Sequence, residues 1–248
     1  MIFDHFFLVL AVTTLASIFS IMFGGGSFIL FPTLFLLGID AKVVVATNLT
    51  AVLAQLITGT IVFNKKKKVN FSVAKSVIPF IVTGAIIGVF ILKGLESELI
   101  KKLVASAIII FATISLFNRD KLLRNNKNVS KKSKMLGGFV SFFNGIYQTT
   151  ISAGSGTTST LILVYFYGLK LKDAIGTRQI ISFASVSIAT SIVVYSGLVD
   201  WIIFFPMLIG RGIGALIGSH IIIKTKSTIL SYLFSIVVIL LALKILFF

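Results

Sequence analysis

Apolar segments recur along the whole chain, each near the ~20 residues that a helix needs to cross ~30 Å of hydrocarbon, and polar connections separate them. We interpret these segments as membrane helices. The first segment is included, because its start carries Asp4 instead of the basic residues of a signal peptide. The long helices are predicted at 6–23, 43–63, 71–92, 98–117, 135–153, 173–196, 200–222 and 227–247.

The composition fits an all-α polytopic membrane protein and excludes an ordinary soluble domain. Of the 248 residues, 57% are hydrophobic and only 12% are charged, and the mean hydropathy is +1.09. The chain has no cysteine, and its two histidines, His5 and His220, lie far apart in sequence. Every acidic residue lies near the end of a segment. We therefore expect no metal, no cofactor and no enzymatic activity.

The two halves of the chain repeat each other at an offset of 130 residues. No gap is needed when residues 24–117 are aligned with 154–247. Glycines stay in register over this length, so a duplicated architecture is predicted. The offset aligns Gly24 with Gly154, Gly26 with Gly156, Gly38 with Gly168, "VNF" (69–71) with "VDW" (199–201), and "GAIIG" (84–88) with "GALIG" (214–218).

Basic residues concentrate in a few connections. Fifteen Lys and Arg residues fall at 65–68, 119–134, 170–172 and 224–226. If the chain turns back at a glycine-rich break in each half, all fifteen lie on one face, which the positive-inside rule identifies as cytoplasmic. The other face then has four lysines and five of the seven acidic residues. We therefore predict two inverted-topology repeats in the plasma membrane of a prokaryote, with both termini outside.

This topology divides the chain into a first membrane repeat at 1–117, a basic cytoplasmic linker at 118–134 and a second membrane repeat at 135–248. Anionic lipid is the expected neighbour of the basic face. Nucleic acid is not an expected partner, because the charge lies in short connections between membrane segments. The sequence makes no prediction of the oligomeric state.

Small residues interrupt the apolar pattern once in each half, as "FGGGS" and as "SAGSGTTST". Each break precedes a short apolar segment, at 27–37 or 157–167, whose ~11 residues span only about 17 Å as a helix. Such a segment is too short to cross the membrane. Each break is therefore predicted to be the tip of a helical hairpin that enters and leaves by one face. Each repeat is then a helical hairpin plus three transmembrane helices, with the two tips meeting near the centre.

The hairpin tips are candidate anion sites. The helix that starts at each tip presents unpaired backbone N–H groups and the positive end of its dipole, and glycine lets an oxyanion reach the backbone. Alternatively, the small residues only allow close helix packing, which is the interpretation we favour for "GAIIG" and "GALIG". The candidate substrate-binding residues at the tips are Gly24, Gly25, Gly26, Ser27, Gly154, Ser155, Gly156, Thr157 and Thr158.

Polar residues inside the predicted helices add three candidates for substrate binding, namely Asn48, Arg178 and Arg211. Arg211 falls near the middle of its helix, where a charge is costly unless it faces a cavity, a partner or an anion. Arg178 repeats the position of Asn48 at the 130-residue offset, and it either snorkels to the cytoplasmic face or guards an entrance. Gln55, Gln148 and Asn144 are weaker candidates, because a lone amide in a membrane helix more often bonds a neighbouring helix.

The stretch "GGGSFILFPTLFLLGIDAKVVVATNLTAV" (24–52) resembles the first-half signature of the sulfite exporter TauE/SafE family of membrane permeases. "GSGTTSTLILVYFYGLKLKDAIGTRQ" (154–179) resembles the second-half signature, although Ile162 stands where the first half has Pro32 and Ser155 interrupts the glycine run. The resemblance covers nearly the whole chain. It implies transport of small sulfur-containing anions such as sulfite, sulfonates or thiosulfate.

The residues and the resemblance together predict a secondary transporter for a small anionic substrate, working by alternating access at a midplane site. The helix ends and arginines indicate an oxyanion, whereas the sulfur comes only from the resemblance. An anion channel, or a permease for an unrelated small organic anion, is the alternative.

Overall fold

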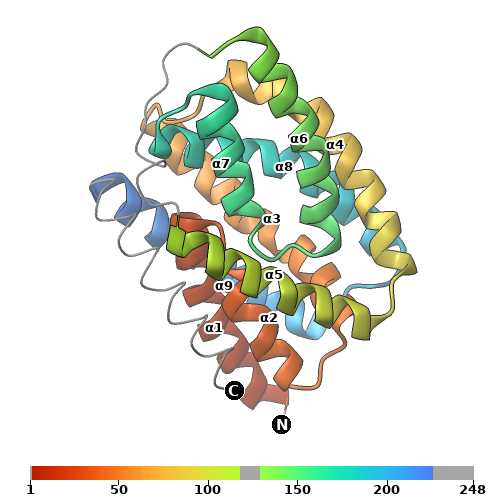
Figure 1. The fold of residues 1–248 in the computed structure, drawn as a ribbon. Helices are drawn as coiled ribbons and strands as arrows, with labels where there is room; N and C mark the ends of the chain where they lie inside the picture. The colour runs from red at the N-terminus through yellow and green to blue at the C-terminus, as the bar shows by residue number, and fades with distance from the viewer. Residues whose placement is uncertain (1, 118–128, 226–248) are drawn as a thin grey trace.

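The structure is a computed structural model that describes residues 2–117 and 129–225, and these residues fold into helices joined by short connections (Figure 1). Nine of the ten predicted segments are found close to their predicted bounds, and the tenth, 227–247, lies outside the described residues. The helices are α1 (Ile2–Phe23), α2 (Ser27–Leu36), α3 (Ala41–Lys65), α4 (Phe71–Gly94), α5 (Ser97–Phe117), α6 (Lys131–Thr150), α7 (Ser155–Tyr167), α8 (Leu171–Tyr195) and α9 (Trp201–Lys224).

Five of the described helices are long and apolar enough to cross a membrane: the part of α1 from Phe6 to Phe23, and α3, α4, α8 and α9. α6 begins at Lys131, four residues before the predicted start at 135, because Ser130 caps it by accepting a hydrogen bond from the N–H of Ser133 (3.2 Å). The end of the predicted linker is therefore helical. The all-helical membrane fold is as predicted.

Two pairs of helices from different halves pack closely, α1 with α9 and α4 with α6, and α3 and α8 lie between the pairs (Figure 1). Glycines make this possible. A Cβ on Gly84 would come within 3.0 Å of the carbonyl of Phe142, and one on Gly214 would come within 3.0 Å of the carbonyl of Thr14. The close-packing interpretation of "GAIIG" and "GALIG" is therefore confirmed.

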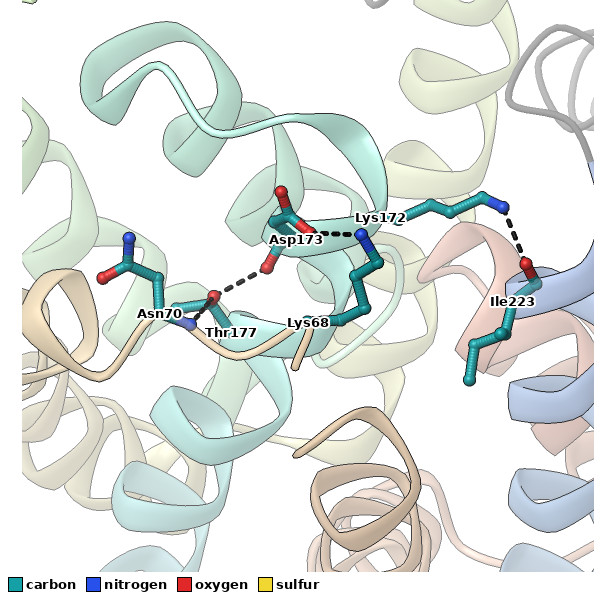
Figure 2. A network of polar contacts seen from close by, with 6 residues as sticks. All are labelled: Lys68, Asn70, Lys172, Asp173, Thr177 and Ile223. Atoms are coloured by element: carbon teal, nitrogen blue, oxygen red, sulfur yellow. Dashed lines mark hydrogen bonds and ion pairs between the residues drawn. The ribbon is translucent and has the colours of Figure 1, made fainter. Parts of the chain in front are cut away.

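Contacts between the halves recur at the 130-residue offset. The backbone N–H of Asn70 donates to Thr177 Oγ1 at 2.9 Å (Figure 2), and the N–H of Asp200 donates to Thr47 Oγ1 at 3.0 Å. Asn70 is the offset equivalent of Asp200, and Thr177 is that of Thr47. The halves therefore exchange the same contact reciprocally, as a two-fold arrangement does.

Basic residues gather at one end of the bundle, which we call the basic end. Here Lys68 pairs with Asp173 across 3.3 Å, and Lys172 Nζ donates to the carbonyl of Ile223 at 2.8 Å (Figure 2). The hydroxyl of the last residue of α7 donates to the carbonyl of Lys134 at 3.0 Å. All four predicted basic connections thus have residues at or next to this end. The side of the membrane that it faces stays a prediction.

The hairpins α1–α2 and α6–α7 enter the bundle from opposite ends. Gly210, Gly214 and Gly218 of α9 each meet a carbonyl of a successive turn of α1, so these two helices run in the same direction. α4 and α6 also run in the same direction as each other. α4, and therefore α6, starts beside the basic end, whereas α9, and therefore α1, starts at the other end. The two hairpins thus enter from opposite ends, as inverted repeats require. Their orientation in a bilayer stays a prediction.

Candidate functional site

The two hairpin tips touch each other inside the protein. Gly24 has a φ of +83°, and a Cβ there would come within 3.0 Å of backbone atoms of Gly156 and Thr157. Thr157 Oγ1 also donates to the carbonyl of Phe23 at 2.6 Å. The predicted meeting of the tips is confirmed, and position 24 requires glycine for both its backbone conformation and its space.

A polar cavity of about 50 Å³ lies beside this contact. Because ~10–15 Å³ is enough for one water molecule, the cavity has room for a small polyatomic ion. Its lining includes Gln55 of α3, Ser182 of α8 and Arg211 of α9, which lie near the middle of their helices. The cavity is therefore at mid-depth in the bundle.

Seven of the twelve predicted binding residues line the cavity: Gly24, Ser27, Asn48, Ser155, Gly156, Arg178 and Arg211. They come from both tips and from α3, α8 and α9. The helices α2 and α7 begin at Ser27 and Ser155, and neither has a side-chain cap. The positive ends of two helix dipoles thus reach the cavity wall, which favours an anion there.

The other five predicted residues lie outside the cavity lining: Gly25, Gly26, Gly154, Thr157 and Thr158. Gly26 packs against α1, where a Cβ would be 2.6 Å from the Cβ of Ser20. Gly154 caps α7 in the left-handed conformation, with a φ of 79°. Thr158 Oγ1 donates to the carbonyl of Ser155 at 2.8 Å and to Asn144 Oδ1. These contacts shape the tips.

Four polar residues of the lining were not among the predicted binding residues, namely Ser20, Ser152, Gln179 and Ser182. Gln55 and Gln148, which were predicted only as weaker candidates, also line the cavity. Helical spacing could have identified Ser182 and Gln55 as cavity residues. Ser182 lies four residues after Arg178, and Gln55 lies seven after Asn48, so each shares a helix face with a selected residue.

Arg178 joins the two tips. Its side chain is buried, with 3% exposure, and does not snorkel. Nη1 donates to the carbonyl of Gly156 (2.8 Å) and to Thr160 Oγ1 (2.9 Å). Nη2 donates to the carbonyls of Ser20 (2.6 Å) and Ile21 (2.9 Å). These two carbonyls belong to the last turn of α1, the negative end of its dipole, so they offset the guanidinium charge.

Arg211 is held by neutral amides instead. It is 1% exposed. Nη1 donates to Gln55 Oε1 at 2.9 Å, and Nη2 donates to Asn48 Oδ1. Gln55 is fixed in turn, because its Nε2 donates to Ser20 Oγ at 3.0 Å and its Oε1 also accepts from Ser17 Oγ at 3.2 Å. The arginine is therefore well positioned, but the residues that the structure describes give its charge no opposite partner.

The charges that the described residues bring to the cavity are positive. Arg178 and Arg211 line it, and no acidic residue of 2–117 or 129–225 does. The ion pairs within the same ranges, Lys68–Asp173 and Lys101–Glu98, involve neither arginine. No group of three or more His, Cys, Asp or Glu in the described part of the chain could hold a metal ion. A buried charge without a counter-charge costs several kcal/mol, so an anion in this cavity would be stabilising.

The family comparison agrees with this geometry. The chain matches the family described as Sulfite exporter TauE/SafE over residues 9–245. The chain belongs to this family. Membership in the TauE/SafE family, together with the five apolar helices, makes it an integral membrane protein of a transporter family.

Curated relatives have similar lengths. A "Probable membrane transporter protein" of Haemophilus influenzae is 22% identical over 215 residues, which is 87% of this chain and 84% of the relative. YjnA of Bacillus subtilis, of the same description, is 26% identical over 213 residues (79% and 82%). YfcA of Escherichia coli K12, also so described, is 23% identical over 217 residues (86% and 79%). No solved structure gives a significant match.

Proposed function

We propose that this protein is a secondary transporter that moves a small oxyanion through the cavity between the hairpin tips. The observation that carries the proposal is Arg211. It is buried, and among the described residues it donates only to neutral amide oxygens. It lines a cavity to which these residues contribute no acidic side chain. An anion bound there supplies the missing counter-charge, and the two helix N-termini add to its stabilisation.

Sulfur oxyanions are the substrate class that we favour, namely sulfite, a sulfonate or thiosulfate. The description of the TauE/SafE family supports this choice, because it names sulfite export. The cavity supports a small ion of this kind, since its volume of about 50 Å³ leaves little room for a large organic group. Sulfite and sulfonates also present several oxygens on one centre, which suits donors that approach from several helices.

Alternating access at this cavity is the mechanism we propose. The tips belong to different halves of the chain, and Gly24 and Gly156 are in backbone contact. Arg178 bridges the same two tips through carbonyls of both hairpins. If one half rocks against the other, these contacts break on one side of the substrate and form again on the other.

The direct test is uptake of labelled sulfite, thiosulfate, sulfate and acetate into proteoliposomes. We expect saturable uptake of the sulfur oxyanions, and at least a tenfold loss in Arg211→Gln, because a charge-assisted hydrogen bond contributes about 1.5–3 kcal/mol. Lys102→Gln removes a charge from an exposed position of α5 and is the matched control, with flux unchanged. Flux that does not saturate would favour a channel, and selective acetate flux would favour a permease for another organic anion.

We also propose that the basic end faces the cytoplasm of a prokaryotic cell and lies among anionic lipid headgroups. The chain has no cysteine, so single cysteines report accessibility without background. A membrane-impermeant thiol reagent applied to intact cells should label Lys93→Cys and leave Lys68→Cys unlabelled. The reverse pattern would overturn this orientation.

A further inference from the structure

Five buried side-chain atoms have no hydrogen-bond partner in the described part of the chain. Three are hydroxyl oxygens, of Thr13, Thr60 and Ser219, and these residues do not line the cavity. The other two belong to cavity-lining residues. They are Arg211 Nε, which can only donate, and Gln179 Oε1, which can only accept. Two of the five atoms thus belong to residues that line the cavity, and one of these is a donor and the other an acceptor.

The orientation of Gln179 is set by its surroundings. The residue is 1% exposed, and its Nε2 donates to the carbonyl of Ile175 at 3.3 Å, one turn earlier in α8. Its side chain also packs on α3, because a Cβ on Gly59 would be 3.2 Å from both Cγ and Cδ of Gln179. These contacts leave Oε1 as the atom without a partner. A buried acceptor that stays unpaired is costly, so a ligand with an O–H or N–H group would be preferred.

We propose that the transported oxyanion carries a hydrogen-bond donor of its own, which donates to Gln179 Oε1 while an oxyanion oxygen accepts from Arg211 Nε. This inference rests on the proposed function and deepens it by naming the substrate class. The class is a protonated oxyanion such as hydrogen sulfite, or a sulfonate with an amino or hydroxyl group next to the sulfur. Gln179 is then a specificity-determining residue, and the substrate's proton meets a neutral amide, since no carboxylate of the described residues lines the cavity.

A matched pair of anions separates this requirement from charge and size. Sulfamate and methanesulfonate are both monoanions with a sulfonate group, and they differ in an amino group against a methyl group of similar volume. Sulfamate can donate to Gln179 Oε1. Methanesulfonate would bury that oxygen against a methyl group and leave it unpaired, a loss of the kind that rejects analogues strongly in sites built to hydrogen-bond their substrate.

The experiment is competition of each anion with labelled sulfite uptake in proteoliposomes of the wild-type protein. Sulfamate should inhibit at a concentration about tenfold lower than methanesulfonate. Gln179→Leu should bring the two concentrations together. Gln148→Leu is the matched control and should keep the wild-type ratio, because Gln148 also lines the cavity but its Oε1 already accepts from Ser185 Oγ at 3.2 Å.

The wild-type comparison decides the matter even if a variant does not fold. Equal inhibition by the two anions, or none by sulfamate, would overturn the donor requirement and leave sulfite transport standing. A ratio that Gln179→Leu does not change would overturn the assignment to Gln179. The absence of flux for sulfite and for every other anion tested would overturn the proposed function itself, and the inference with it.

Discussion

Replacing Gly24 with alanine should force the two hairpin tips apart. The new Cβ would lie 2.5 Å from Arg178 Nη1, whereas ordinary contact begins at 3.4 Å, so the guanidinium must move by about 0.9 Å. Backbone atoms of Gly156 and Thr157 would be closer than 3.0 Å, and backbone cannot give way as a flexible side chain can. The substitution therefore disturbs both the tip contact and the arginine that bridges it.

Gly38→Ala is the matched control for the backbone term. Gly38 has a φ of +77°, but a Cβ there would meet nothing within 4 Å, so alanine costs only the left-handed conformation, about 1 kcal/mol. Gly24→Ala carries the same cost. Overpacking adds about 1–3 kcal/mol, and displacement of Arg178 weakens hydrogen bonds worth about 1.5–3 kcal/mol each. We expect Gly24→Ala to be roughly 3 kcal/mol less stable than Gly38→Ala.

Thermal unfolding in detergent measures this difference, with the fluorescence of Trp201, the one tryptophan of the chain, as the signal. A difference of roughly 3 kcal/mol corresponds to a Tm about 6–12 °C lower for a chain of this size. Sulfite uptake should fall in Gly24→Ala and persist in Gly38→Ala. Equal Tm values for the two variants would refute the tip contact and the reasoning built on it.

Three further predictions concern the scaffold. Thr47→Val and Thr177→Val should each destabilise the protein by about 1 kcal/mol, because each leaves a backbone N–H without its acceptor; unequal losses of Tm would contradict the reciprocal contact. Gly214→Ala should lower Tm by several degrees through its clash with α1, whereas Gly212→Ala, with nothing within 4 Å, should raise Tm through a gain of up to about 1 kcal/mol in helix propensity. Partial burial raises the pKa of Asp40, but hydrogen bonds from a serine hydroxyl and backbone N–H groups outweigh it and hold the pKa below 3.8. Its contribution to stability should therefore be present above about pH 3.8 and be lost as the pH falls below that value, and Asp40→Asn should remove this part of the pH dependence.

Much of the fold could be predicted because span length and charge placement are strong constraints in a membrane protein. The bounds of α3 and α4 follow directly from the apolar segments and their polar ends. The start of α6 could not be placed as well, because Lys131 and its neighbours look like linker, and the cap by Ser130 is a local hydrogen bond that hydropathy does not show.

The candidate site was predictable where the residues are unusual in a membrane helix. Glycine breaks and Arg211 are costly in that setting, so their presence needs a reason. Gln179 is different, because an amide in a membrane helix is compatible with ordinary packing. The role of Arg178 was also beyond the sequence, since two of its acceptors, the carbonyls of Ser20 and Ile21, are more than 150 residues away in the chain.

The central claim is that the cavity binds an anion through Arg211, and sulfite-dependent thermal stabilisation of the purified protein tests it most directly. Binding to the folded state alone stabilises by about 2.7 kcal/mol at a ligand concentration of 100 times Kd. We expect Tm to rise with sulfite concentration in the wild type and in Lys102→Gln, whereas Arg211→Gln, although folded, should need at least ten times more sulfite for the same rise. An equal rise in Arg211→Gln at the same sulfite concentration, or none in the wild type, would contradict the claim.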